Sequence, residues 1–321
     1  MKIGIIGAGA VGAATVGNLV QPGGVDPEIV LIDRNEKKAV GLAEDFSYAA
    51  ALNSLATVRA GGYDDLAGAD LVIVNAGVNE KEGGATDRGD AQGRRRLIPV
   101  NARVYAEIIP RVQETAPGTT LLVITDPPDP LAEIVRHLAP GLHVLSAGTV
   151  IDTLRFRFHI AREFGVRAGD VEATVLGEHG TSSVYLWSSA RVGGVRVLDL
   201  LARRGDDTAE VQHRISEAVT YSNISIIEGI GASQYGIGAV TARIAEAIVR
   251  DEHAILPVAS HHQEYGTTIS LPSVVGRFGV ERVMCPDLTD KERTSLEESA
   301  QVLRDAAQTA LNSLGATGPL E

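Results

Sequence analysis

Two short segments of the sequence carry a histidine, an aspartate and an arginine that could support proton transfer and anion binding. His179 lies between glycines in residues 177–180, directly after an apolar run, and its imidazole is expected to titrate near neutral pH. Asp152 and Arg155 stand three residues apart, so both project from one face of a helix. A carboxylate can fix the tautomer of an imidazole, and a guanidinium can hold a carboxylate through two parallel hydrogen bonds. These residue types favour acid–base chemistry on a small organic anion.

The same residues also have structural interpretations. A single histidine such as His179 is more often a structural loop residue. Thr149 and Asp152 have the spacing of a helix capping box, and Asp152 with Arg155 could form an ordinary exposed ion pair. A second motif is needed to favour chemistry over structure.

That motif is the glycine-rich segment Gly7-Ala8-Gly9-Ala10-Val11-Gly12, which follows a short apolar run and opens a helical pattern. In a GxGxxG sequence the first glycine allows a tight turn, the second admits a pyrophosphate, and the third lets helix and strand pack closely. The helix start offers free N–H groups to phosphates. Gly7, Gly9, Ala10, Val11 and Gly12 are therefore predicted to bind a dinucleotide.

Asp33 ends the second predicted strand, 21 residues beyond Gly12. A carboxylate at this place can accept hydrogen bonds from an adenosine ribose and repel a 2′-phosphate, which favours NAD over NADP. Arg34 beside it works against this preference, because a guanidinium could reach a phosphate. The structural alternative is a glycine turn that packs a helix, with Asp33 as a surface residue.

The first half of the chain alternates short apolar runs with longer segments of helical period, which predicts an α/β fold with a doubly wound parallel sheet. The predicted strands are residues 3–6, 29–32, 57–59, 71–74, 121–124 and 144–145, and the predicted helices are residues 10–20, 36–52, 95–114 and 129–138.

The pattern changes near residue 146, so residues 1–146 are expected to form a dinucleotide-binding Rossmann domain and residues 147–321 an α+β catalytic domain. In the second half we expect helices at 149–164 and 290–314, a long helical region at 207–250, and strands at 171–176, 254–260 and 268–275. Residues 184–201 form a further apolar run around Gly193 and Gly194.

The composition predicts a folded, soluble protein of 321 residues, with 44% hydrophobic and 22% charged residues. A net charge of −12 disfavours nucleic acid and anionic membrane surfaces as partners. Charges, glycines or prolines interrupt every apolar run, so no membrane span or signal peptide is expected. Cys285 is the only cysteine, which excludes an intrachain disulfide and suits the reducing cytoplasm.

Three motifs in this order resemble the L-lactate/malate dehydrogenase family: the glycine loop, residues 148–157 (GTVIDTLRFR) and residues 177–180 (GEHG). Residues 184–188, 235–238 and 270–276 are also similar to it. The resemblance implies a homodimer or homotetramer that uses NAD to move a hydride between the nicotinamide C4 and C2 of a 2-hydroxy or 2-oxo acid. Ala76 and Gly77 would then contact the cofactor.

The resemblance also implies roles for single residues. His179 would be the acid–base, Asp152 its orienting carboxylate, and Arg155 the clamp on the substrate carboxylate, and Ser233 would line the substrate pocket. General acid–base help of this kind is worth roughly 10² to 10⁴ in rate. No metal is implied.

The mobile loop of the family, which brings an arginine to the substrate carbonyl, corresponds to residues 79–94 and is longer and richer in glycine here. Counting back from Asn101 places Arg94 at the polarising position, whereas counting forward from Lys81 places Arg88 there. We prefer Arg94. Glu80 stands where the family selects the substrate side chain, and a carboxylate there would repel a second substrate carboxylate, unless it faces solvent.

Asp126 replaces an asparagine that the family usually carries beside the carbonyl oxygen and nicotinamide. An ionised aspartate cannot donate a hydrogen bond and adds negative charge to the site. It could therefore be protonated, pair with a basic group, or accompany a different substrate, and neutral drift is a further alternative. Thr181 and Tyr185 also depart from the family pattern and predict an altered pocket wall.

We therefore expect an NAD-dependent L-2-hydroxy acid dehydrogenase. Two alternatives are a reductase of an unusual polar or cationic 2-oxo acid, and an NAD-binding protein without catalysis. A metal enzyme built on His253, His261, His262 and Glu264 is disfavoured, because adjacent residues on a strand face opposite ways.

Overall fold

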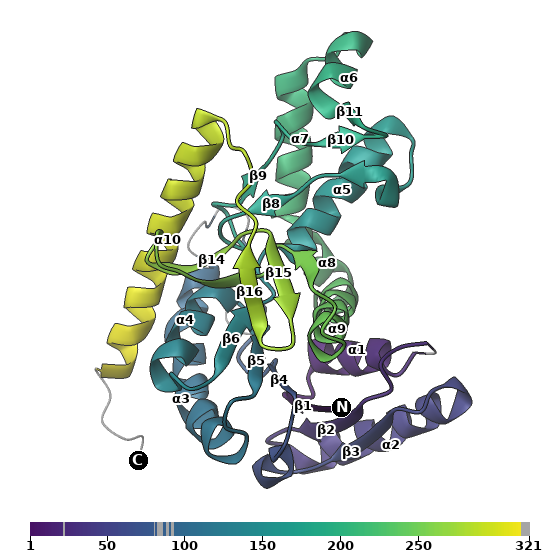
Figure 1. Ribbon diagram of the computed structural model, residues 1–321, viewed down its shortest axis with the longest axis vertical. Coiled ribbons are helices and arrows are strands. Elements are labelled where there is room, and N and C mark those ends of the chain that lie inside the picture. Colours follow the sequence, from purple (N-terminus) through teal and green to yellow (C-terminus); the bar gives the residue numbers. More distant parts are fainter. Residues whose placement is uncertain (22, 80, 82–85, 88–89, 91–92, 316–321) are drawn as a thin grey trace.

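A computed structural model describes residues 1–21, 23–79, 81, 86–87, 90 and 93–315. Its centre is a parallel sheet formed by the first six strands: β1 (Lys2–Ile6), β2 (Glu28–Ile32), β3 (Thr57–Ala60), β4 (Leu71–Val74), β5 (Thr120–Val123) and β6 (His143–Ser146). Two strands from late in the chain, β13 (Ala259–His262) and β14 (Thr267–Ser270), extend it in the antiparallel sense. The resulting order is β14-β13-β6-β5-β4-β1-β2-β3 (Figure 1).

Both faces of this sheet are buried, which explains the uninterrupted apolar sequences of its central strands. All four residues of β4 are buried, and their side chains alternate between two cores. Leu71 and Ile73 belong to one core, while Val72 and Val74 belong to the other. The predicted doubly wound arrangement is therefore confirmed.

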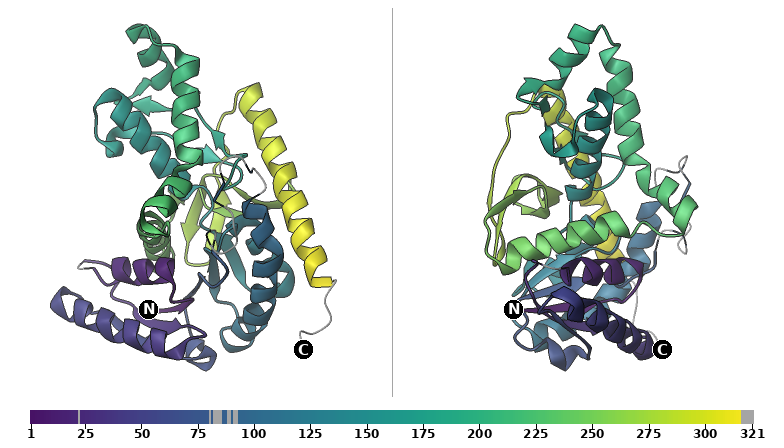
Figure 2. Two further views of the ribbon diagram at one scale, coloured as in Figure 1. Left: turned by 180° about the vertical axis from the view of Figure 1, so that it is seen from behind. Right: turned by 90° about the vertical axis from the view of Figure 1, so that its right-hand side faces the viewer.

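Helices cover each face (Figures 1 and 2). On one side lie α1 (Ala10–Leu19), α2 (Glu36–Asn53) and α9 (Tyr235–Val249), and α9 packs against α1. On the other side lie α3 (Ile98–Thr115), α4 (Pro128–Leu138) and the C-terminal α10 (Asp290–Gly315), which packs against both. A short 3-10 helix, η2 (Arg94–Leu97), leads into α3, and another, η1 (Tyr63–Leu66), precedes β4.

The elements of residues 150–220 form a lobe at the top of Figure 1. It contains α5 (Val150–Phe164), η3 (Ala168–Asp170), β7 (Val171–Glu172), β8 (Val175–Leu176), β9 (Val184–Tyr185), β10 (Arg191–Val192), β11 (Val195–Arg196), α6 (Val197–Arg204) and α7 (Thr208–Thr220). Phe156 of α5 is fully buried there, with Tyr185 and Trp187 packed edge-on against its ring. This third core fixes the orientation of α5.

Several sequence-based boundaries are wrong. The expected strand at residues 171–176 is two strands in different sheets, because Ala173 and Thr174 direct their carbonyls to Arg157 and Leu186. The long helical region is three helices: α7, α8 (Ser222–Ile230) and α9. Gly231, with a φ of 84°, ends α8 in a left-handed conformation that favours glycine.

Prolines explain two further corrections. The strand expected at residues 254–260 is divided at Pro257 into β12 (Ala254–Leu256) and β13. The strand expected at residues 268–275 is divided at Pro272 into β14 and β15 (Ser273–Gly276). Proline has no N–H to donate to a sheet. The sequence patterns also missed β16 (Gly279–Val283), which pairs with β15. No helix in the described part of the chain combines the length and apolarity needed to cross a membrane.

Candidate active site

A cleft opens where the glycine loop between β1 and α1 meets the segments that follow β4, β5 and β6. The first turn of α5, the turn between α8 and α9, and His179 complete its lining. In open α/β sheets, ligands bind outside the carboxyl ends of the parallel strands. The cleft therefore brings the predicted phosphate loop and the predicted acid–base residues together.

His179, which lines this cleft, makes a short polar contact with Asp152. His179 Nδ1 lies 2.5 Å from Asp152 Oδ2, and the two side chains are 13% and 6% exposed. The backbone N–H of His179 donates to Oδ2 of Asp129, a buried residue of α4, at 2.9 Å. The imidazole is thus fixed through its ring and its backbone, and Nε2 is the ring nitrogen that Asp152 does not engage.

The capping-box interpretation of Thr149 and Asp152 is wrong. The Thr149 side chain makes no cap hydrogen bond, because its hydroxyl donates to the Val175 carbonyl at 2.5 Å. Asp152 is buried and faces His179. The interpretation as an exposed ion pair with Arg155 is also wrong, since Arg155 Nη1 lies 3.6 Å from Asp152 Oδ1 and its side chain is only 15% exposed.

Electrostatics favour the charged forms of this pair. Burial by itself lowers the pKa of the His179 imidazole, but the charge and hydrogen bond of Asp152 outweigh it and hold the pKa above its usual value. Burial raises the pKa of Asp152, and His179, Arg155 and Arg94 reverse this, so the pKa of Asp152 is lowered. The environment therefore favours an imidazolium facing a carboxylate.

Arg94, at the start of η2, reaches the same cleft. Its Nε lies 3.5 Å from Asp126 Oδ2, and its Nη1 donates to the His179 carbonyl oxygen at 3.5 Å. Arg155 and Ser233 also line the cleft. Of the remaining candidates, Glu80 and Arg88 lie outside the described residues.

The glycine loop has the geometry of a phosphate cradle. Gly7 has a φ of 103°, and a Cβ on Gly12 would lie 2.1 Å from the Gly7 oxygen, so neither position accepts a side chain. A Cβ on Gly9 would meet no atom within 4 Å, so the space beside its α-carbon is open to a ligand. Gly9 is also the N-cap of α1 and provides no side-chain cap, which leaves the helix N–H groups available.

Asp33 lies beside this loop. Its two carboxylate oxygens accept hydrogen bonds from the Ala8 N–H at 2.8 Å and the Asn35 N–H at 2.9 Å, and the side chain remains partly exposed. Each oxygen has a second lone pair for a ribose hydroxyl. Arg34 is exposed next to it.

Asn75, directly after β4, is a cleft residue that the motif search missed. Its side-chain oxygen and nitrogen are both buried, and neither has a hydrogen-bond partner among the described residues. Such an amide is suited to a bound ligand that supplies a donor and an acceptor. Its position at the carboxyl end of a buried strand was the available signal. Gly77 also lines the cleft, whereas Ala76 packs against the second core.

The two other departures from the family pattern have different surroundings. Thr181 is exposed. The Tyr185 hydroxyl lies 2.9 Å from Thr220 Oγ1 and donates to the Ser216 carbonyl oxygen, so it ties β9 to α7. Tyr185 therefore holds the helix whose end, Thr220, lies beside the cleft.

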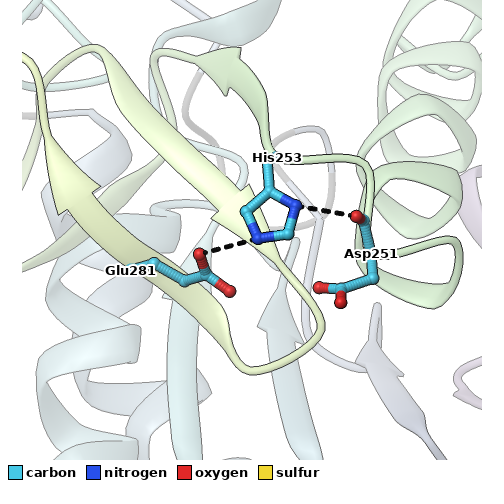
Figure 3. Close-up of side chains that lie close together, drawn as sticks. All are labelled: Asp251, His253 and Glu281. Carbon is cyan, nitrogen blue, oxygen red and sulfur yellow. Dashed lines mark hydrogen bonds and ion pairs between the residues drawn. The ribbon is translucent and has the colours of Figure 1, made fainter.

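The residues considered for a metal centre are distributed over separate contacts. His253 Nε2 lies 3.2 Å from Glu281, and together with Asp251 they form an exposed group whose candidate ligand atoms lie within 4.8 Å of one another (Figure 3). His261 instead contacts Glu133 at 3.0 Å, and the ring of His262 packs on Tyr265.

A Rossmann-type sheet whose cleft combines a glycine-rich loop at a helix start, a histidine–aspartate pair and two arginines is typical of an NAD-dependent dehydrogenase. Sequence comparison agrees at the level of family. The NAD binding domain of lactate/malate dehydrogenase matches residues 1–143, and the alpha/beta C-terminal domain of lactate/malate dehydrogenase matches residues 149–314. The chain belongs to the lactate/malate dehydrogenase family, which confirms the resemblance drawn from its motifs.

Individual relatives support the same assignment. The chain is 42% identical to an L-lactate dehydrogenase of Deinococcus radiodurans, with 96% of this chain and 99% of that protein covered. It is 40% identical to an L-lactate dehydrogenase of Thermus aquaticus, with 96% and 98% covered. A crystal structure of a minor L-lactate dehydrogenase from Enterococcus mundtii matches with a TM-score of 0.87 and 30% identity over 96% of this chain and 98% of that chain. The protein is thus an NAD-dependent oxidoreductase that acts on a CH–OH group.

Proposed function

We propose that the protein interconverts a small L-2-hydroxy acid and the corresponding 2-oxo acid, with lactate and pyruvate as the first pair to test. The observation that carries this proposal is the 2.5 Å contact between His179 and Asp152 in the cleft shared with the phosphate loop. A protein that only bound NAD would need no such proton-transfer pair. The names of the relatives favour lactate and pyruvate.

The glycine loop and Asp33 would hold the cofactor, which would accept the hydride as NAD during oxidation and supply it as NADH during reduction. The protein supplies the rest. His179, as an imidazolium, gives its Nε2 proton to the oxygen at C2 during reduction and takes it back during oxidation. Asp152 keeps Nδ1 protonated and stabilises the positive ring. Arg155 holds the substrate carboxylate, and Arg94 stabilises negative charge on the C2 oxygen.

The test is the loss of NADH absorbance with the pure protein and a panel of 2-oxo acids: pyruvate, oxaloacetate, and branched, aromatic, hydroxylated and cationic acids. Turnover of pyruvate that His179→Gln abolishes, while NADH binding persists, is the expected result. Turnover of only a cationic or extended acid would instead support a reductase of an unusual polar or cationic 2-oxo acid. No turnover at all, with NADH bound, would favour a non-catalytic binding protein.

We also propose that the chain forms a homodimer or homotetramer. Tyr48 and Leu52 of α2, and Leu55 just after it, are large apolar side chains exposed to solvent in a single chain. Burying them against another copy would remove apolar surface from water. Sedimentation equilibrium tests this directly, and a monomer at micromolar concentration would contradict it.

A further inference from the structure

Asp126 lies in the segment between β5 and α4, and its backbone is held firmly in place. The Asn101 side chain donates to the Asp126 carbonyl oxygen at 2.9 Å. The same amide accepts from the Val78 N–H at 2.7 Å and donates to the Val78 carbonyl at 3.2 Å. Asn101 is fully buried, so it fixes the segments after β4 and β5 relative to each other. The Asp126 side chain therefore starts from a well-defined point at the cleft.

The Asp126 carboxylate turns toward Arg94. Asp126 Oδ2 is buried and makes no hydrogen bond to a described residue, but the Arg94 Nε lies 3.5 Å away. The two side chains are 20% and 18% exposed, so water screens their attraction less than at an open surface. On its other side the Arg94 guanidinium reaches the carbonyl oxygen of His179. Arg94 is thus held between Asp126 and the acid–base residue.

An arginine that stabilises a reacting carbonyl is more effective when its side chain is already fixed before substrate binds. Its long side chain otherwise loses rotamer entropy when it becomes fixed. Arg94 is the first residue of η2, and its guanidinium contacts Asp126 and the His179 carbonyl oxygen in the cleft. Asp126 forms an ion-pair contact with Arg94 through its buried Oδ2.

We propose that Asp126 is a positioning residue that acts as counter-ion to Arg94 and holds its guanidinium beside His179 before substrate binds. This inference rests on the proposed function for the role of Arg94, but the contact itself does not. The proposed role depends on the aspartate that replaces the usual asparagine. An asparagine could not act as counter-ion, because its amide has no charge to attract the guanidinium.

The first test is a double-mutant cycle of Asp126→Asn and Arg94→Gln, read as kcat for pyruvate at saturating NADH. We expect Asp126→Asn to lower kcat roughly tenfold when Arg94 is present and less than about twofold when Arg94 is glutamine. Asp126→Glu, which keeps the charge, should retain most of the rate. Equal losses in both backgrounds would show that Asp126 acts independently of Arg94 and would overturn the proposal.

The second test needs no turnover, so it separates this inference from the proposed function. Several charged groups surround the His179 imidazole. The negative groups are Asp126, Asp129 of α4, Asp152 of α5 and Glu178, which precedes His179 in the chain, and the positive groups are Arg94 of η2 and Arg155 of α5. Arg94 opposes protonation of His179 by charge repulsion, and so lowers its pKa. If Arg94 stayed in place without Asp126, Arg94→Gln would raise the pKa of His179 by the same amount in the parent protein and in Asp126→Asn.

If Asp126 holds Arg94, Arg94→Gln raises the pKa of His179 in the parent protein and leaves it nearly unchanged in Asp126→Asn. The measurement is an NMR titration of ¹³C-labelled histidine, with the His179 signal assigned from His179→Gln. The matched control is Asp287→Asn, which removes an exposed carboxylate and changes the net charge by the same amount as Asp126→Asn. It should change neither kcat for pyruvate nor the pKa of His179. Equal pKa shifts in both backgrounds would overturn the proposal, even in a protein that reduces none of the acids tested.

Discussion

His179 Nδ1 and Asp152 Oδ2 lie 2.5 Å apart although the two residues are 27 positions apart in the chain. The third core fixes α5, which carries Asp152, and the Asp129 carboxylate holds the backbone of His179. The pair is therefore assembled by tertiary packing from two sides. Its geometry leads to direct expectations for variants and for pH.

Asp152→Asn should lower kcat/KM for pyruvate by about 10² or more, because the imidazolium loses its charged partner. It should also shift the pH dependence. Asp152 holds the pKa of His179 above its usual value, and reduction needs the protonated ring, so activity is present below this pKa and lost as pH rises through it. Without Asp152 the pKa falls, and the loss occurs at lower pH. A pH series of kcat/KM measures both effects.

NADH affinity, measured by fluorescence titration, is the control for Asp152→Asn and should stay within about twofold of the parent. A variant with an unshifted pH profile would show that Asp152 does not control the proton affinity of His179.

Arg155→Lys should act mainly on KM. Lysine keeps the charge but cannot form two parallel hydrogen bonds to a carboxylate, so KM for pyruvate should rise roughly tenfold or more. Arg162→Lys, an exposed arginine on the same helix, is the matched control and should leave KM unchanged. Steady-state kinetics at saturating NADH provide the measurement. An unchanged KM in Arg155→Lys would exclude a bidentate clamp.

Arg94 and Arg88 are distinguished by single alanine variants. Arg94 reaches the cleft beside His179, so Arg94→Ala should lower kcat by about 10² to 10³, the usual effect of removing a group that stabilises a developing oxyanion. Arg88→Ala should change kcat only a few-fold. The reverse pattern would assign the carbonyl contact to Arg88.

Asp33→Asn should relax the preference for NAD. The amide keeps an acceptor for the loop but removes the charge that repels a 2′-phosphate, so the ratio of kcat/KM for NADP to that for NAD should rise about tenfold. Adding Arg34→Ala should reverse part of this gain if the guanidinium reaches the phosphate. An unchanged ratio in Asp33→Asn would mean that other contacts select the cofactor.

Asp129→Ala should destabilise the protein. It removes the acceptor for the His179 N–H and for the Ser146 hydroxyl, and each unpaired buried donor costs about 1–3 kcal/mol. Urea unfolding with intrinsic fluorescence measures the loss in the free energy of unfolding. A variant as stable as the parent would mean that water or a rearranged side chain satisfies both donors.

Asp129 also gives a pH expectation. Burial is the main cause that raises its pKa from 3.8 to about 6, so the folded state binds a proton more tightly than the unfolded chain over this range. The contribution of Asp129 to the free energy of unfolding therefore falls as pH rises from 3.8 to about 6. Asp129→Asn should remove this contribution, which unfolding experiments across that range can detect as a changed slope.

Local patterns predicted the parts of the site that depend on local geometry. The GxGxxG turn, the DxxR spacing and the position of His179 after a strand follow from backbone rules that act within a few residues. The structure brings the corresponding residues Gly9, Asp152, Arg155 and His179 into one cleft.

Contacts between distant segments could not be predicted in this way. The patterns gave no sign that Asp129 would hold the His179 backbone, that Asn75 would present an amide to the cleft, or which basic group would face Asp126. Each depends on packing of separate elements. The division of residues 171–176 was missed for a related reason, since β7 and β8 find their partners in different sheets.

The antiparallel strands β13 and β14 have a consequence for synthesis of the chain. β13 pairs with β6 at Ala259 opposite Ser146, and β14 pairs with β13, so more than a hundred residues are made between the two partners. Until residues 259–270 leave the ribosome, β6 is an edge strand with unpaired backbone groups. The apolar faces of α3 and α4 also stay exposed until α10 is made and packs against them. The exposed strand edge of a nascent or truncated chain can then pair with the same edge of another copy of the chain. Synthesis of β13 pairs that edge at Ser146, so a chain that stops between residues 238 and 258 is expected to aggregate although it contains all the residues that line the cleft.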